Sequence, residues 1–348
     1  MVIVSHYLAN SLNLTGWADA LTGPLQQMGG LGVELFFLLS GFLITSILVR
    51  EHETTGRVDL KKFYLRRTFR ILPAMYAFVL TVAVLVALGM VDASWWEVAA
   101  AALFIYNYAP DVGTWWLGHT WSLAVEEQFY LIWPAVVLLL KPRKAIWFCV
   151  AGILVVPALR VVTWLLGDEP TRDRIMYMFH ARADSLLTGC LLAVVLAMRP
   201  VLWGQLQGWV ARLHLPAVGL VALIASQVLT LRFGGTWSQS VGFSVENIAL
   251  AVIFIGALTQ GKRLTMAMSW RPLGLVGLIS FSLYLWQQLF LTHHNTTILG
   301  HPAVALFATF GAALLSYHLV EKPFLRLKKK YETASALVPT ERATALQR

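Results

Sequence analysis

Charged side chains are scarce in this sequence. They make up 13% of its 348 residues, whereas hydrophobic residues make up 58%, and the mean hydropathy is +0.67. A soluble domain carries about a quarter charged residues. The apolar runs at 72–91, 145–166 and 302–320 also approach the ~20 residues that a membrane-spanning helix needs. The composition therefore excludes an ordinary soluble domain and predicts a membrane protein.

Cysteine is scarce as well. Cys149 and Cys190 both lie inside apolar runs, so the sequence predicts neither a disulfide framework nor a metal site. The net charge of +9 is not arranged as a basic stripe interleaved with aromatic residues, the pattern typical of nucleic-acid binding. We therefore expect no nucleic-acid partner, no metal and no permanently bound cofactor.

The apolar runs predict an all-α fold, a polytopic transmembrane helix bundle of about ten spanning helices. The start of the chain would supply one span, and the others fall at roughly 30–50, 72–91, 121–140, 145–166, 185–202, 215–231, 240–259, 272–292 and 302–320.

Basic clusters between these runs predict the orientation. Lysine and arginine follow the runs at 30–50 and 121–140, flank the loop after 185–202 and precede 272–292. All of these clusters fall on the cytoplasmic side, as the positive-inside rule requires, if residues 94–120 make no net crossing. We therefore expect 94–120 to be an interfacial or re-entrant segment on the outer side, and both termini to be cytoplasmic.

The two ends of the chain differ from this core. The apolar start, MVIVSHYLA, is far shorter than a span and has no basic segment before it, so we expect a first helix that is truncated at its N-terminus. Residues 1–326 are expected to form a single membrane domain. Residues 327–348 are basic and polar, and we expect a disordered cytoplasmic tail.

Five ionisable residues interrupt the apolar runs at a similar depth near the outer side. They are His6, Glu34, Glu126, Arg182 and Asp184. Such groups cost about 2.5 kcal/mol or more at the centre of a membrane helix and are functional candidates by default. Each also has a structural interpretation, because the histidine can be interfacial and either glutamate can form a buried ion pair with Arg182. Their convergence predicts a polar pocket in an apolar wall.

Helical spacing adds two hydroxyl groups to this set. Ser122, Glu126 and Tyr130 are separated by four residues and share one helix face, so we expect both hydroxyls beside the substrate. Glu127 points about 100° away and is expected to be less buried. His119 lies just outside this layer and is a weaker candidate.

Six blocks of sequence occur in an order that resembles a known family. They are GGLGVELFFLLSGFLIT, FYLRRTFRILPAMY, WSLAVEEQFYLIWP, HARADSLLTG, ISFSLYLW and VEKPF. Together they are similar to the acyltransferase 3 family of integral-membrane O-acyltransferases, which includes O-antigen and other bacterial polysaccharide acetylases. The resemblance covers residues 1 to about 326. It implies a bacterial inner-membrane protein that transfers an acetyl or longer acyl group from acyl-CoA to a hydroxyl, commonly on a sugar.

The resemblance also implies roles for the five buried ionisable residues. His6 corresponds to the essential histidine of the first helix, Glu126 to the carboxylate of the WSL block, and Glu34 to the acidic residue of the first block. Arg182 and Asp184 correspond to the R-x-D pair.

The Arg-rich motif that the family uses for the CoA phosphates falls on Arg66, Arg67 and Arg70. Two positions depart from the family pattern. An arginine that usually stands eleven residues before the histidine would lie upstream of Met1, and the block often written YLWH reads YLWQ here, with Gln287.

These residues support a hypothesis of acyl transfer. A sugar hydroxyl is a weak nucleophile at neutral pH, so His6 would act as a general base, with Glu126 or Glu34 orienting its ring. A covalent acyl-histidine is an alternative. Arg182 would stabilise the oxyanion or pair with Asp184. The expected partners are acyl-CoA (acetyl-CoA first), a carbohydrate or lipid-linked saccharide acceptor, and the lipid bilayer.

Two other classes of protein remain open at this point. In a membrane transporter or flippase for a sugar or lipid, the same ion pairs would line a substrate path, although the sequence shows no inverted repeat. A non-catalytic membrane scaffold would leave the buried carboxylates unexplained. Release of free CoA would indicate the enzyme, and uptake without CoA consumption would indicate the transporter.

Overall fold

The computed structural model describes residues 1–11, 17–109, 115–259, 266, 269–292 and 298–328, and every regular element in these ranges is helical. The longer helices are α2 (Trp17–Thr55), α3 (Leu60–Ala87), α6 (Thr120–Leu166), α8 (Phe179–Met198), α9 (Pro200–Arg212), α10 (Leu215–Phe233), α12 (Phe243–Thr259), α15 (Ser280–Phe290) and α16 (Pro302–Ser316). The shorter α-helices are α1 (Val2–His6), α4 (Trp95–Ala102), α5 (Trp115–Gly118), α7 (Glu169–Arg174), α11 (Gly235–Trp237) and α14 (Arg271–Leu278). The 3-10 helices are η2 (Tyr106–Tyr108), η3 (Ile175–Tyr177) and η5 (Ile298–Gly300), and the π-helices are η1 (Tyr7–Ser11), η4 (Ser238–Gly242) and η6 (Tyr317–Glu321). The predicted all-α fold is confirmed.

Seven helices in the described ranges are long and apolar enough to cross a membrane, or eight if the bent pair α14 and α15 forms one span. They cover Met28–Thr55, Leu60–Ala87, Trp115–Leu166, Glu169–Met198, Leu215–Phe233, Gly235–Thr259 and Pro302–Lys328. The chain is therefore a multi-pass membrane protein by the length and composition of its helices, while the predicted number of about ten spans is not confirmed. The predicted tail lies, from residue 329 onward, outside the described residues.

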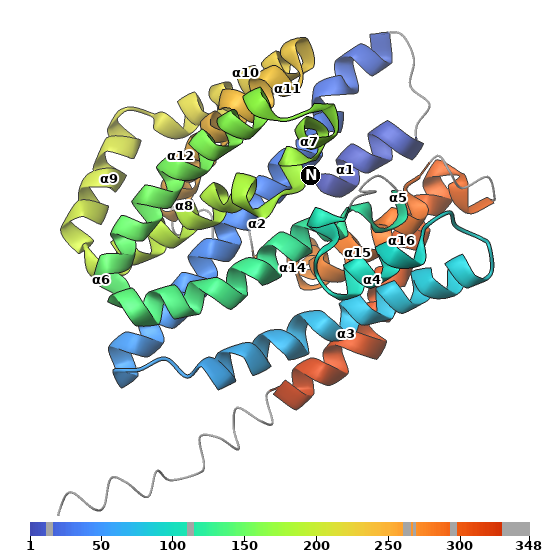
Figure 1. Cartoon of the computed structure of the whole chain (residues 1–348), viewed down its shortest axis with the longest axis horizontal. Coiled ribbons are helices and arrows are strands. Elements are labelled where there is room, and N and C mark those ends of the chain that lie inside the picture. Colours follow the sequence, from blue (N-terminus) through green and yellow to red (C-terminus); the bar gives the residue numbers. More distant parts are fainter. Residues whose placement is uncertain (12–16, 110–114, 260–265, 267–268, 293–297, 329–348) are drawn as a thin grey trace, which may run out of the picture.

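Helix α6 contains both of the runs predicted at 121–140 and 145–166. Its backbone leaves the helical region at Lys141, where φ is 62° and ψ is 154°. The cause is local, because Pro142 follows and a proline disfavours the helical conformation of the residue before it. Figure 1 shows α6 turning at this point into two rods.

The described residues of the segment predicted to make no crossing, 94–109 and 115–120, contain the short helices α4, η2 and α5 and the start of α6. Helix α4 begins with a capping box, in which the Ser94 side chain and the Glu97 side chain each bond the backbone of the other. The Tyr106 hydroxyl then donates to the buried Glu97 carboxylate at 3.0 Å and folds η2 back onto α4. At 1.5 Å per residue α4 is about 12 Å long, less than half a bilayer core.

Helices α2 and α8 cross in close contact at two glycines. A β carbon on Gly41 would fall on the backbone carbonyl of Leu186, and one on Gly189 would fall on that of Leu38. Small residues let the backbones of membrane helices approach in this way. The contact matters for the site because α2 carries Glu34 and α8 carries Arg182.

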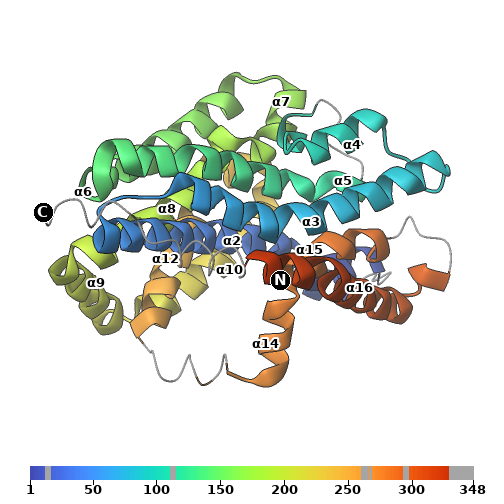
Figure 2. The same cartoon turned by 90° about the horizontal axis from the view of Figure 1, so that it is seen from below.

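The two ends of the bundle differ in charge. The end of α2, the break in α6 and the end of α8 come together around a small cavity lined by His52, Lys141, Arg143, Lys144 and Met198, among others. In Figures 1 and 2 this basic end, which also holds α9, lies opposite the end formed by α4 and α5. The arrangement agrees with basic clusters gathered on one side of the membrane.

Candidate active site

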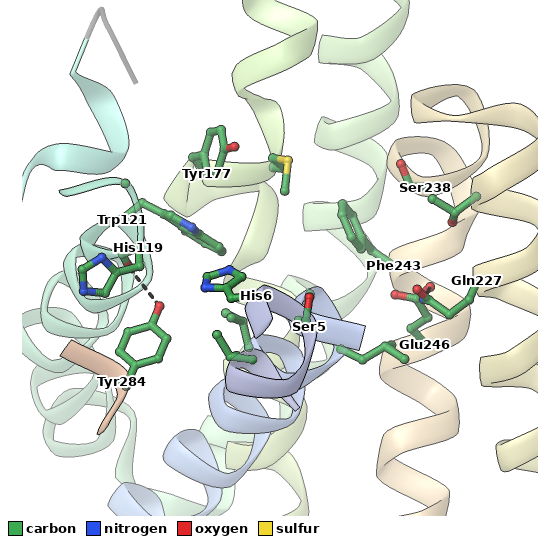
Figure 3. A pocket seen from close by; sticks show the side chains of 18 of the residues that line it. Ser5, His6, His119, Trp121, Tyr177, Gln227, Ser238, Phe243, Glu246 and Tyr284 are labelled. Carbon is green, nitrogen blue, oxygen red and sulfur yellow. Dashed lines mark hydrogen bonds between the residues drawn. The ribbon is translucent and has the colours of Figure 1, made fainter. Parts of the chain in front are cut away.

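A cavity of about 530 Å³ opens beside His6. It is lined by the start of the chain, by α2 at Gly29 to Leu31, and by the aromatic residues Trp115, Trp121, Tyr177 and Tyr284. Figure 3 shows the His6 ring near the centre of this space, between the aromatic side and a polar side formed by α10 and α12. The histidine predicted as the base is therefore in a cavity and not at the lipid surface.

A chain of hydrogen bonds fixes the His6 ring. Gln288 Nε2 donates to the backbone carbonyl of Trp115 at 2.6 Å, and Gln287 Nε2 donates to Gln288 Oε1 at 3.0 Å. Gln287 Oε1 is then left to face His6 Nδ1 at 2.7 Å. Because an amide oxygen can only accept, Nδ1 carries the proton and Nε2 keeps a free lone pair. The ring is thus held in the tautomer that a general base needs.

The predicted orienting carboxylates are not at this ring. The structure places Gln287 beside His6, with the Trp115 ring centroid 5.0 Å from that of the histidine. From the sequence, Gln287 was noted only as a departure from the family block. The YLWQQ run could have indicated its role, because two adjacent amide side chains in an apolar helix need hydrogen-bond partners.

Glu126 lies in a second, smaller cavity of about 230 Å³. Its Oε1 accepts a hydrogen bond from Ser40 Oγ at 2.6 Å and another from the Tyr130 hydroxyl. The guanidinium of Arg67 lies 3.7 Å from the centre of the Tyr130 ring. Arg67 and Arg70 both line this cavity, so Glu126 and Tyr130 lie beside the basic motif, as part of one polar group.

The third arginine of the motif is placed elsewhere. Arg66 forms an ion pair with Glu51 at 3.4 Å, near the basic end of α2, and does not line the cavity. The motif therefore presents two cations to the cavity and one to the end of the neighbouring helix α2.

The two cavities share part of their walls. Val2, Val33 and Tyr284 line both of them. The Tyr284 hydroxyl donates to the backbone carbonyl of His119 at 2.9 Å and lies 2.6 Å from Ser122 Oγ. Ser122 is therefore at the boundary between the His6 cavity and the Arg67 cavity.

Glu34, Arg182 and Asp184 form ion pairs in the wall. Arg182 pairs with Glu34 at 3.0 Å and covers the Phe243 ring at 4.0 Å. Asp184 pairs with Arg160 at 3.1 Å. Of the alternatives open from the sequence, the structure shows Arg182 bonded to Glu34 and not to Asp184.

Arg160 was missed by sequence reasoning. It is fully buried and donates to the carbonyls of Gln239 and Ala181, at 3.2 and 2.8 Å, and to Ser244 Oγ at 2.8 Å. A single arginine in the apolar run 145–166 was the available signal, because such a charge must be paired inside a membrane bundle.

His119 is more deeply placed than its position in the sequence indicated. It is 5% exposed, lines the His6 cavity, and packs against the rings of Phe78 and Tyr284 at 5.2 and 5.3 Å between centroids. Among the described residues, neither of its ring nitrogens has a hydrogen-bond partner. Glu127, by contrast, is less buried than Glu126, as the helical spacing predicted.

The predicted residues are thus divided among two adjacent cavities and a buried ion-pair network. Among the described residues, no group of three or more histidine, cysteine, aspartate or glutamate side chains is placed to hold a metal ion. The arrangement offers a half-buried base in one cavity and a pair of cations in the next. Such a site suits proton removal beside an anionic co-substrate.

These features define the protein by class as a multi-pass helical membrane protein with a histidine in one cavity and arginines in the next. More specifically, the chain belongs to the acyltransferase family whose model, described as "Acyltransferase domain", matches residues 1–321. The family predicted from the six sequence blocks is confirmed.

Curated relatives carry a similar description. The chain is 27% identical over 342 residues to "O-acetyltransferase OatA" of Staphylococcus aureus (strain MRSA252), covering 90% of this chain and 55% of that protein. It is 28% identical over 324 residues to "Putative O-acetyltransferase SACOL0978" of Staphylococcus aureus (strain COL), covering 85% of this chain and 52% of that protein. The chain therefore spans about half the length of the curated relatives that it matches. No solved structure matches the chain.

Proposed function

We propose that this chain is a membrane O-acyltransferase that moves an acetyl or other acyl group from acyl-CoA to a hydroxyl of a saccharide acceptor. The observation that supports it most is the fixed tautomer of His6, whose free Nε2 belongs to a ring in a cavity next to Arg67 and Arg70. The family and the O-acetyltransferase relatives support the same reaction class.

The donor would bind at the smaller cavity. Acyl-CoA carries phosphates, and guanidinium groups bond phosphate in a forked, charge-assisted geometry. Arg67 and Arg70 line this cavity and form no salt bridge among the described residues, whereas Arg66 is already paired with Glu51. We propose acetyl-CoA as the donor and expect its thioester end to extend from this cavity toward Tyr284 and Val2, where the second cavity begins.

The transfer itself uses His6. Its Nε2 takes the proton of the acceptor hydroxyl while the oxygen attacks the thioester carbonyl carbon. The tetrahedral intermediate then expels the CoA thiolate, which receives the proton from the imidazolium, so the products are an ester and free CoA. The Gln287 carbonyl holds Nδ1–H throughout. Arg182 is occupied by Glu34 and lines neither cavity, so its part here is to hold the wall.

The orientation of the protein in the membrane follows from the location of the donor. Acyl-CoA is a cytoplasmic metabolite, and Arg67 and Arg70 lie on α3 toward the basic end of the bundle. We propose a bacterial inner-membrane protein with the basic end and both termini in the cytoplasm, in line with the positive-inside rule.

The test measures CoA release by purified protein supplied with acetyl-CoA and a saccharide. We expect His6→Ala to lower the rate by about 10²–10⁴-fold, because the general base is lost. Undiminished CoA release in this variant would contradict the proposal. Substrate uptake into vesicles without CoA release would favour the transporter instead.

The donor site has its own test. We expect Arg67→Ala and Arg70→Ala each to raise the KM for acetyl-CoA about tenfold, since each removes a charge-assisted bond. The KM for S-acetylpantetheine, which lacks the nucleotide phosphates, serves as the matched control and should change little. Arg66→Ala should have the smallest effect of the three.

A further inference from the structure

The wall of the large cavity that faces His6 is polar. It is formed by Gln227 and Thr230 of α10, Ser238 and Gln239 of η4, and Glu246 of α12. Figure 3 shows Gln227, Ser238 and Glu246 across the cavity from the histidine, on helices that sequence reasoning did not connect with the site. The transfer chemistry described above uses none of these five residues.

Two of these side chains have hydrogen-bonding atoms that nothing in the described structure satisfies. Gln239 is 5% exposed and its Oε1 has no partner, and Thr230 Oγ1 is buried without a partner as well. A buried polar group without a partner is costly in the folded protein. Both residues line the cavity, so a ligand with hydroxyl groups would supply the missing hydrogen-bond partners.

The rest of this wall is held rigidly. Glu246 Oε1 accepts from Ser226 Oγ and from Gln227 Nε2, both at 2.7 Å. Arg160 Nε donates to the backbone carbonyl of Gln239 and so fixes the π-helix η4. π-Helical turns are rare and are frequent at functional sites. The wall is therefore preorganised, as a binding surface for a polar ligand should be.

The opposite side of the cavity is aromatic. The rings of Trp121 and Tyr177 meet at 5.3 Å between centroids, and Trp115 lies against His6. Aromatic walls with a few convergent polar groups are typical of small-molecule sites, and the volume of about 530 Å³ is within their usual range. A sugar ring presents an apolar face and a rim of hydroxyls, and it matches both sides.

The charge of the lining residues indicates the charge of the ligand. No lysine or arginine is among the described residues that line this cavity, and Glu246 contributes a carboxyl group. The neighbouring cavity, by contrast, contains Arg67 and Arg70. Arg182, whose guanidinium covers the lining residue Phe243, is already paired with Glu34. An anionic group buried beside Glu246 would therefore have no unpaired counter-charge among the described residues.

We propose that the wall formed by Gln227, Thr230, Ser238, Gln239 and Glu246 is the acceptor subsite, and that it takes the acceptor as an uncharged, hydroxyl-rich sugar unit. Naming this ligand the acceptor rests on the proposed function. The proposal that a neutral sugar unit binds here rests on the cavity alone. The two cavities then divide the substrates by charge, with the anionic donor at the arginines and the neutral acceptor opposite His6.

The test is equilibrium binding to the full-length purified protein, without acyl-CoA. The probes are radiolabelled methyl glucoside and methyl galactoside, each paired with its hexuronide, which differs by one carboxylate. We expect saturable binding of at least one neutral glycoside, at least tenfold weaker binding of its uronide, and roughly tenfold weaker binding of the neutral probe to Gln239→Leu. Ser240→Ala is the matched control, because Ser240 is in the same π-helix as Gln239, its hydroxyl donates to the backbone carbonyls of Thr236 and Trp237 in α11, and it does not line the cavity.

Turnover separates this inference from the function it rests on. With acetyl-CoA present, Gln239→Leu should raise the KM for the neutral glycoside and leave the KM for acetyl-CoA within twofold. Equal or tighter binding of the uronide, or absence of binding by both neutral probes, would overturn the acceptor subsite while leaving CoA release intact. Neutral-glycoside binding without any CoA release would instead support the subsite and contradict acyl transfer.

Discussion

Gln287 connects His6 to the backbone carbonyl of Trp115 through Gln288. Two neutral amides therefore orient the imidazole in a part of the protein where a carboxylate would be expensive to bury. The arrangement holds the ring without adding charge, so a carbonyl dipole, and no carboxylate, stabilises the imidazolium at Nδ1.

Replacing Gln287 tests this positioning. We expect Gln287→Leu to lower kcat roughly 10- to 100-fold with little change in the KM for acetyl-CoA, because the ring loses its tautomer and direction. Gln287→Glu should keep the ring oriented and move the acid limb of the pH–rate profile to higher pH, since a carboxylate favours the imidazolium. A purely structural role would lower the amount of folded protein in both variants and leave the pH profile in place.

The ion pair between Glu34 and Arg182 offers a second test at this scale. Arg182→Met leaves a buried carboxylate unpaired, which typically costs about 3–5 kcal/mol. We expect poor folding of this variant and partial recovery in Glu34→Gln/Arg182→Met, measured as monodisperse protein after detergent extraction. Recovery is the deciding result, because a catalytic role for Arg182 alone would give none.

The sequence revealed the ionisable residues but not their partners. His6, Glu34, Glu126 and Arg182 stood out because charge is rare in apolar runs. Arg160 and Glu246 carried the same signal and were not used. Which carboxylate meets which arginine depends on helix rotation, and a shift of one residue turns a side chain by about 100°.

At the scale of helices, α2 and α8 are joined through Gly41 and Gly189. The close approach places Glu34 and Arg182 on facing helices and brings Cys190 Sγ to 3.4 Å from the Gly41 carbonyl. This crossing supports the ion-pair network from the inside of the bundle.

Gly189→Ala should loosen this crossing. Its β carbon would overlap the Leu38 carbonyl, and overpacking of this kind costs about 1–3 kcal/mol. We expect a fall of several degrees in the apparent melting temperature. Gly204→Ala on α9 is the control, since a β carbon there meets nothing within 4 Å, and alanine favours a helix more than glycine does. Equal melting temperatures for the two variants would contradict the close crossing.

The sequence predicted the break in α6 correctly, while its number of about ten spans is not confirmed. The KPRK run combined a proline with basic residues, and these are local signals. An apolar run in the sequence shows local composition. A membrane span also needs a helix that is long enough and unbroken. Helix α14 is too short to cross alone and meets α15 at a bend of 72°, which hydropathy does not show.

For the whole molecule, the sidedness of the bundle makes a direct prediction. Arg57 and Asp92 are exposed and flank opposite ends of α3, and the native Cys149 and Cys190 are fully buried. We expect a membrane-impermeant maleimide to label Asp92→Cys in intact spheroplasts, and Arg57→Cys only after permeabilisation. Labelling of both from the same side would contradict the proposed orientation.

Tyr284 belongs to the walls of both cavities, and the thinness of that shared boundary has a consequence for the cell. If donor and acceptor meet there, neither has to cross the lipid bilayer. The nucleotide part of the donor stays on the cytosolic side, and the glycan acceptor stays on the outer side. Only a fragment the size of an acetyl group would then cross the membrane, as part of a covalent modification and not as a free metabolite.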